Sequence, residues 1–253
     1  MAIQLSERDS LIFRFINEHH VLLEKHIAWF ISCDEKPVLI RDRLRKLFYL
    51  DYLLCERHGG KLPWWTTPTK PLVYMLSPMT RQMVKATDDA MDLNNADVQR
   101  HLLEVANLRM LFLVDQKDGV ISDMDWTTIQ KSNITDSGVD ACVTFKRDGA
   151  VSKIGIVNHP KNSAELAMAL QTAISEQNLD AIWIVSRDEA HQAMLQKALV
   201  GTPIASKLCF TTHQDVYKSG MVRVNWQSAM PMPVEFVADR MGWGPTLSPA
   251  QAC

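Results

Sequence analysis

Long hydrophobic runs are missing from this sequence of 253 residues. No apolar stretch approaches the roughly 18 residues that a helix needs to span a bilayer. The N-terminus also lacks the basic segment, apolar stretch and small-residue cleavage site that together mark a secretory signal peptide. We therefore expect a cytoplasmic protein that is neither secreted nor inserted into a membrane.

The sequence also has few cysteines and none of the common catalytic motifs. Its five cysteines are odd in number and never spaced as Cys-x-x-Cys, which argues against a disulfide framework and a structural zinc cluster. A glycine-rich phosphate loop, a serine nucleophile elbow and a His-Glu-x-x-His motif are absent as well. We accordingly expect no bound cofactor. The cysteines are Cys33, Cys55, Cys142, Cys209 and Cys253.

The net charge is small, at −2, but it is unevenly distributed. Between Lys36 and Lys85 ten lysines and arginines stand against three acidic residues, a surplus of seven, so the remaining residues sum to −9. Hydrophobic residues make up 47% and charged residues 22%, which is typical of a folded protein rather than a disordered one. Because the chain is longer than one typical domain, we expect two folded units, the first basic and suited to nucleic acid.

Three short amphipathic helices are expected at the N-terminus. Ser6 is suited to cap the first helix, and Asp9 occupies the acidic position of a capping box. In all three segments apolar residues recur at spacings of three and four, which places them on one helical face. The apolar faces are Leu11, Ile12, Phe15 and Ile16 in the first helix, Leu23, Ile27, Phe30 and Ile31 in the second, and Ile40, Leu44, Leu47 and Phe48 in the third.

A β-hairpin with a long tip is expected after the helices. Its strands fall at 52–58 and 72–76, and a Gly- and Pro-rich stretch separates them. Three helices closed by a hairpin is the order of a winged helix-turn-helix. After a further helix near 80–85, the polar run 87–97 is expected to end this domain, to which we assign residues 1–90.

The second unit, residues 97–225, combines a long helix with alternating strands and helices. Its first helix carries apolar residues from Val98 to Phe112 on one face, and later apolar runs bounded by turn residues predict strands. The chain is thus expected to be an α+β or α/β protein. Residues 226–253 show no clear period, so an irregular tail is expected there. The later elements are predicted as strands at 139–146 and 151–158, a helix at 163–176, a strand at 181–185, a helix at 189–199 and a strand at 207–211.

The third helix and the hairpin tip carry the residues that we expect to contact DNA. A recognition helix lies in the major groove with basic side chains outward while its apolar stripe docks on the other helices. Arginine can bond both acceptors of guanine, and either arginine or lysine can bind phosphate. The two tryptophans of the tip stack on nucleotides in one interpretation and pack back on the protein in the other. The expected DNA-binding residues are Arg41, Arg43, Arg45, Lys46, Tyr49, Arg57, Lys61, Trp64, Trp65 and Lys70.

Four short motifs stand out between residues 5 and 215. They are Leu5-Ser-Glu-Arg-Asp9, Arg41-x-Arg-Leu-Arg-Lys-Leu47, Leu72-Val-Tyr-Met-Leu-Ser77 and His101-Leu-Leu-Glu-Val-Ala-Asn-Leu-Arg-Met110. Together they resemble the plasmid replication-relaxation family, whose members join a winged helix to a domain similar to restriction endonucleases, as related mobilisation relaxases do. The resemblance implies plasmid replication, transfer or mobilisation as the setting. It implies double-stranded DNA as the partner, together with a second copy of the chain or another protein of a transfer or replication complex.

The second unit is also similar in layout to the restriction-endonuclease core. In that core an Asp at the start of one hairpin strand and a Glu-x-Lys or Glu-x-Asp on the next hold a divalent cation. Asp140 occupies the first position, but Ile156 and Asn158 occupy the matching positions of the next strand. Since isoleucine cannot ligate a cation and asparagine offers only a neutral carbonyl, we expect no metal site and no catalytic residue in this domain.

Other polar residues receive structural interpretations. Glu104 lies on an otherwise apolar helix, where a structural role is favoured over that of an active-site acid. His101, His159 and His213 meet only if the fold brings them together, and we do not assign them as metal ligands. Four aspartates fail the spacing of a calcium loop and are expected in a solvated loop. They are Asp115, Asp118, Asp123 and Asp125.

These features predict a sequence-specific double-stranded DNA-binding protein of a mobile element, acting as an accessory factor or regulator in plasmid transfer, replication or transcription. Two alternatives stay open, namely a metal-dependent relaxase or nickase and a protein-docking adaptor built on the degenerate nuclease core. The missing acidic and basic groups at 156 and 158 favour the DNA-binding protein and the adaptor over the enzyme.

Overall fold

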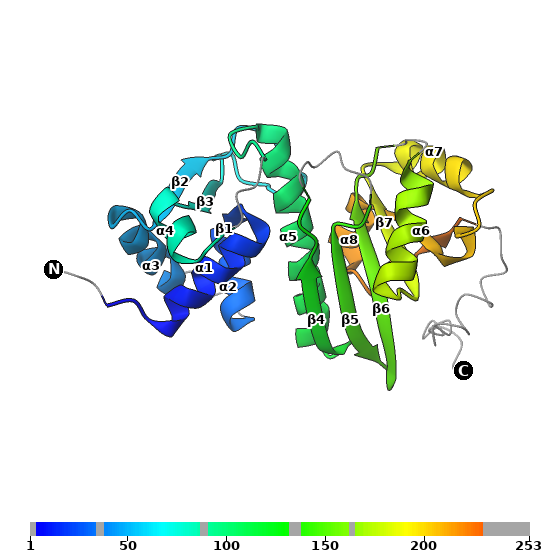
Figure 1. The fold of residues 1–253 in the computed structure, drawn as a ribbon, viewed down its shortest axis with the longest axis horizontal. Helices are drawn as coiled ribbons and strands as arrows, with labels where there is room; N and C mark the ends of the chain where they lie inside the picture. Colours follow the sequence, from blue (N-terminus) through cyan, green and yellow to red (C-terminus); the bar gives the residue numbers. More distant parts are fainter. Residues whose placement is uncertain (1–3, 34–37, 87–90, 132–137, 162–164, 230–253) are drawn as a thin grey trace, which may run out of the picture.

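The computed structural model describes residues 4–33, 38–86, 91–131, 138–161 and 165–229. Within them the protein has the mixed helix-and-sheet fold that the sequence predicts, with a three-stranded and a six-stranded sheet. The long helix α5 stands between the N-terminal helices and the larger sheet (Figure 1). None of the helices in these residues is both long and apolar enough to cross a membrane.

The three N-terminal helices lie close to their predicted positions. Ser6 and Asp9 form the expected capping box, in which the Asp9 carboxylate accepts hydrogen bonds from the Ser6 backbone amide at 2.7 Å and from its hydroxyl at 2.8 Å. The apolar faces meet in one core, where Ile16 and Leu44 are fully buried. The helices are α1 (Glu7–His19), α2 (Glu24–Ser32) and α3 (Val38–Tyr49).

A three-stranded sheet packs against these helices. Strands β2 (Leu53–Arg57) and β3 (Leu72–Leu76) form the expected hairpin, and β1 (Leu22–Leu23) pairs with the other edge of β3. The sequence did not predict β1, because two residues are too few to show a period. Helix α4 (Pro78–Met83) follows, and Ser77 caps its first turn.

Helix α5 (Ala96–Lys117) contributes to two hydrophobic cores. Val105 and Phe112 pack against the larger sheet, whereas Ala106 and Met110 pack among the N-terminal helices. The sequence analysis placed one apolar face on this helix and assigned it to the second unit alone. The boundary expected just before α5 therefore separates two cores that share a helix, rather than two units with independent cores.

The six-stranded sheet has its strands in the order β4-β5-β6-β7-β8-β9. Strands β6, β7 and β8 are parallel, and the other neighbouring pairs are antiparallel. The strands are β4 (Ser122–Thr128), β5 (Ala141–Arg147), β6 (Ala150–Asn158), β7 (Ala181–Ser186), β8 (Leu208–Thr212) and β9 (Gln227–Ser228).

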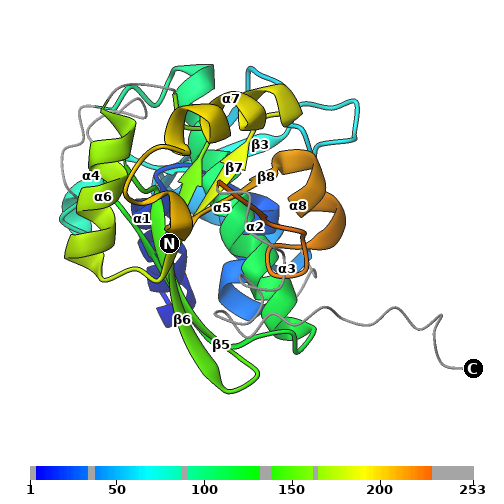
Figure 2. The ribbon, with the colours of Figure 1, turned by 90° about the vertical axis from the view of Figure 1, so that its right-hand side faces the viewer.

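Helices cover both faces of this sheet (Figures 1 and 2). Helices α6 (Leu166–Gln177) and α7 (Glu189–Leu199) pack on one face, while α5 and the short helix α8 (His213–Ser219) pack on the other. The predicted helix at 189–199 is confirmed at both ends, and the one predicted at 163–176 begins three residues later. Helix α8 was not predicted from the sequence.

The acidic segment after α5 differs from its prediction as a solvated loop. Asp115 is fully buried, and its carboxylate accepts hydrogen bonds from the Val222 backbone amide at 2.9 Å and from Arg223 at 3.1 Å. Residues 122–128 form the edge strand β4, which buries Trp126 and leaves its aspartates facing outward. An edge strand with one buried side chain carries too little apolar alternation to be distinguished from a loop.

Residues 226–229, which were expected to begin an irregular tail, continue the fold. The Trp226 ring stacks on Trp183, with the ring centroids 4.4 Å apart. Strand β9 then pairs with β8, and the segment is held by this one aromatic contact and a two-residue ladder. Neither feature produces a sequence period. The rest of the predicted tail, from residue 230 onward, lies outside the described residues.

Candidate functional site

Helix α3 has the division into a buried and an exposed face that the sequence predicts. Ile40, Leu44 and Leu47 are buried in the N-terminal core. On the opposite side Arg45, Lys46 and Tyr49 are exposed, and Tyr49 retains 74% of its accessible surface. The exposed face therefore presents two cations and one aromatic ring to solvent.

Arg41 and Arg43 differ from these residues because each has an acidic partner. Arg41 pairs with Glu24 of α2 at 3.0 Å, and since its side chain is 54% exposed this pair contributes little stability. Arg43 donates two hydrogen bonds to the carboxylate of Asp9, which is fully buried. The Arg43 guanidinium is thus turned toward α1 and has a structural partner that the sequence did not reveal.

The hairpin tip combines exposed lysines with partly covered tryptophans. Lys61 and Lys70 are exposed, and Arg57 donates to the Lys70 carbonyl at 3.3 Å. Trp65 donates its ring N–H to the Thr69 carbonyl at 2.7 Å.

Trp64 makes the contact between the hairpin tip and the second unit. Its ring meets Tyr217 of α8 edge-on, with the centroids 5.4 Å apart. In Figure 2 the cyan loop that joins β2 to β3 extends over α8. Of the two interpretations of this tryptophan, packing on the second unit describes its position.

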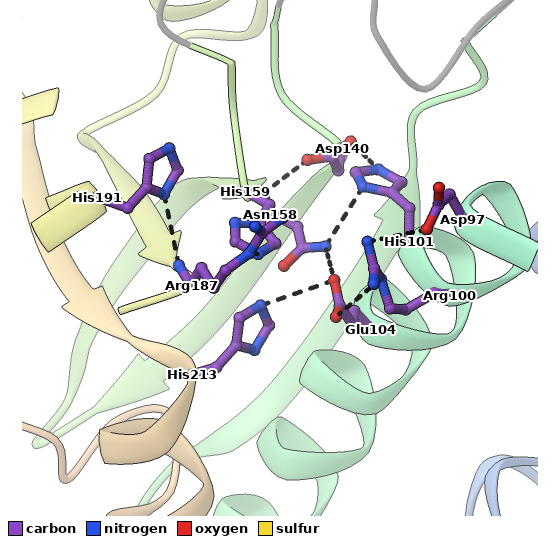
Figure 3. Close-up of polar contacts among 10 residues, drawn as sticks. All are labelled: Asp97, Arg100, His101, Glu104, Asp140, Asn158, His159, Arg187, His191 and His213. Atoms are coloured by element: carbon purple, nitrogen blue, oxygen red, sulfur yellow. Dashed lines mark hydrogen bonds and ion pairs between the residues drawn. The ribbon is translucent and has the colours of Figure 1, made fainter. Parts of the chain in front are cut away.

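A cleft lies at the carboxyl edge of the parallel strands, where open α/β sheets commonly bind ligands. It has a volume of about 370 Å³, and a second cavity of about 550 Å³ adjoins it and reaches the hairpin tip. The chain enters the cleft directly after β6 at Asn158 and His159, after β7 at Arg187 and after β8 at His213. Helix α5 contributes Arg100, His101 and Glu104 from the facing side (Figure 3).

Asp140 is the most heavily partnered residue in the cleft. Its carboxylate accepts hydrogen bonds from Lys131 at 2.7 Å, from His101 at 3.0 Å and from the Asn158 backbone amide at 2.6 Å. Burial alone would raise the pKa of Asp140, but the charges and hydrogen bonds of His101 and Lys131 hold it well below its ordinary value. Ile156, at the matching position of the next strand, is fully buried in the core. The carboxylate therefore already has cationic partners and no acidic neighbour on β6.

Glu104 also points into the cleft rather than into the core of the sheet. It accepts a hydrogen bond from the Asn158 side-chain amide at 3.0 Å and lies 4.0 Å from Arg100. Its side chain is 4% exposed, and burial raises the pKa of the carboxyl, against the opposing effect of Asn158 and the nearby cations. The structural role favoured by the sequence analysis did not anticipate this position.

Two histidines face Glu104 across the cleft. The rings of His159 and His213 have centroids 5.4 Å apart, and His213 Nε2 lies 3.8 Å from a Glu104 carboxylate oxygen. Burial lowers the pKa of His159 to about 4, with a further contribution from Arg187, and lowers that of His213 to about 3. Both rings are therefore uncharged at neutral pH.

The sequence signal for this cleft is positional. Asn158, Arg187 and His213 each stand at the end of an apolar strand or within one residue of it. Because parallel strands end at the same edge of a sheet, such residues converge without sharing any local motif. Glu104 carries no comparable signal, since only the packing of α5 directs it to the same edge.

None of the protein-family models, curated protein sequences or solved structures compared with this chain matches it. The argument for function accordingly depends on the fold and on the side chains described above.

Proposed function

We propose that this protein is a sequence-specific double-stranded DNA-binding protein whose α2, α3 and β2–β3 hairpin act as a winged helix-turn-helix. The observation that carries the proposal is the exposed face of α3, where Arg45, Lys46 and Tyr49 are free of the core that the same helix builds. A helix about 10–12 Å across fits the major groove, and its polar face then meets the base edges.

Different basic residues have different roles in this proposal. Arg45 and Lys46 lie at the centre of the exposed face and supply base contacts. Arg41 lies beside α2, and Lys61 and Lys70 lie on the hairpin, so these three supply phosphate contacts that fix the orientation on the duplex. Trp64 links the hairpin to α8 and has a structural role.

The biological setting follows from the resemblance to the plasmid replication-relaxation family. We place the protein in plasmid transfer, replication or transcription, as an accessory factor or regulator. The partnered state of Asp140 and the buried position of Ile156 support a regulator over a nickase, because a cation site needs uncompensated carboxylates.

Fluorescence anisotropy with labelled duplexes tests the proposal. The full chain is used because α5 completes the core of the N-terminal helices. Genome-wide DNA capture first identifies the preferred site, and binding to it and to random DNA is then measured over a range of salt. We expect affinity to fall steeply with salt, since each phosphate contact releases counterions.

Three variants separate reading from anchoring. Lys46→Ala should reduce discrimination between specific and random DNA by roughly 1–3 kcal/mol, whereas Lys61→Ala should weaken both alike. Lys197→Ala is the matched control, because Lys197 is an exposed lysine on α7, far along the chain from α3. No salt-sensitive binding to any duplex, or equal losses for Lys46→Ala and Lys197→Ala, would reject the proposal.

A further inference from the structure

We propose that Glu104, His159 and His213 form a binding site for a divalent transition-metal ion of the zinc type. One ligand atom from each residue lies within 4.8 Å of the other two, and no ion is present. The site departs from the sequence expectation of no metal, because the three residues come from α5, from the end of β6 and from the start of α8. It does not depend on DNA binding.

The donor set selects the class of metal. Two imidazole nitrogens and one carboxylate suit a borderline cation such as zinc, and the same set occurs in catalytic zinc sites that keep one position open. Magnesium prefers octahedral oxygen ligands and is disfavoured here. This set is also distinct from the position of Asp140, whose carboxylate is held by Lys131 and His101.

His213 provides an independent observation. It is 3% exposed, and neither of its ring nitrogens has a hydrogen-bond partner among the described residues. Buried polar groups are nearly always paired, so a ring with both nitrogens unpaired lacks a ligand that the protein itself does not supply. A metal ion bound to one nitrogen satisfies that requirement.

The neighbours of the three residues support the same assignment. The Asn158 amide donates to Glu104 at 3.0 Å and orients its carboxylate, as outer hydrogen bonds do around metal ligands. His159 has a φ of 57°, an uncommon backbone conformation for a residue other than glycine. The Arg187 Nε lies 3.3 Å from His159 Nε2, so a cationic group already occupies the lone pair of that nitrogen, and Arg187 is exposed and can turn away.

The open side of the site indicates what the metal would meet. The adjoining cavity of about 550 Å³ is lined by Lys61, Arg100 and Arg187 together with Trp64. Three cations around the open position favour an anionic ligand, and an oxyanion such as a phosphate group fits this chemistry. The aromatic ring of Trp64 adds an apolar wall on the side of the hairpin.

Titration of the full chain with zinc tests the proposal. The protein is treated with a chelator, dialysed and titrated by calorimetry at neutral pH, and cobalt is titrated in parallel while visible absorption is recorded. We expect one ion per chain and the absorption bands of low-coordinate cobalt with nitrogen and oxygen ligands. His213→Ala and Glu104→Gln should each lower zinc affinity by about a hundredfold or more and abolish the cobalt bands.

His191→Ala is the matched control. His191 lies in the same cleft, with its ring centroid 5.3 Å from that of His159, but it is not one of the three proposed ligands. Its removal should leave the affinity unchanged, and circular dichroism establishes that each variant is folded. The proposal is overturned if the wild type binds no zinc in stoichiometric amount, if it shows no such cobalt bands, or if His191→Ala loses as much affinity as His213→Ala.

Discussion

Replacing Arg43 by methionine removes the cationic partner of a buried carboxylate. Asp9 is fully buried at the start of α1, and its carboxylate accepts two hydrogen bonds from Arg43 and two from Ser6. Breaking a buried ion pair costs about 3–5 kcal/mol, because the remaining charge loses its compensation. The bonds from Ser6 persist in the variant, so we expect a loss of about 2–3 kcal/mol in the free energy of unfolding.

Urea and thermal denaturation of the full chain, followed by circular dichroism, measure this loss. For a chain of this size it corresponds to a decrease in Tm of roughly 5–10 °C. Arg45→Met is the matched control, since Arg45 is on the same helix, is 61% exposed and approaches Asp42 only to 3.9 Å. Its effect should be within about 0.5 kcal/mol. A melting temperature of Arg43→Met equal to that of the wild type would refute the structural role and return Arg43 to the DNA-contacting residues.

The pH dependence of the same loss provides a second measurement. Burial would raise the pKa of Asp9, but the hydrogen bonds from Arg43 and Ser6 and the charge of Arg43 hold it below its ordinary 3.8. A carboxyl group with a lowered pKa stabilises the fold above its unfolded pKa, and this stabilisation is lost as pH falls through the folded value. The difference between wild type and Arg43→Met should therefore be constant at neutral pH and shrink below pH 3.8. A difference that grows in that range would contradict the assignment.

Mild acid should destabilise the protein through its buried histidines. Burial lowers the pKa of His26 from 6.5 to about 3, so its stabilising effect is complete above 6.5 and is lost as pH falls toward 3. Between neutral pH and about pH 5 the loss for this residue is about 2 kcal/mol, and a urea midpoint that does not change over that interval would contradict the prediction. With magnesium or manganese, the protein should not nick supercoiled plasmid carrying DNA from its native element, because Asp140 is already paired with Lys131 and His101. Nicking that Asp140→Ala abolishes would establish the relaxase alternative.

Local sequence determined most of the secondary structure. The capping box of Ser6 and Asp9, the apolar spacing of the N-terminal helices and the hairpin around β2 and β3 were all predicted, because each depends on residues a few positions apart. The turn between β5 and β6 is another such case. Asp148 and Gly149 have φ values of 50° and 83°, which a tight hairpin turn requires of its two central residues. The exposed residues of α3 follow from the same helical period.

Only the tertiary structure decided which polar residues meet. Arg43 and Asp9 pair because α3 crosses α1, and the apolar pattern of either helix contains no information on that crossing. Glu104, His159 and His213 converge because α5 lies across the ends of parallel strands, and the sequence separates them by more than fifty positions each time. Hydrophobic periodicity specifies which side of an element is buried, whereas the partner of a buried side depends on long-range packing that no local window contains.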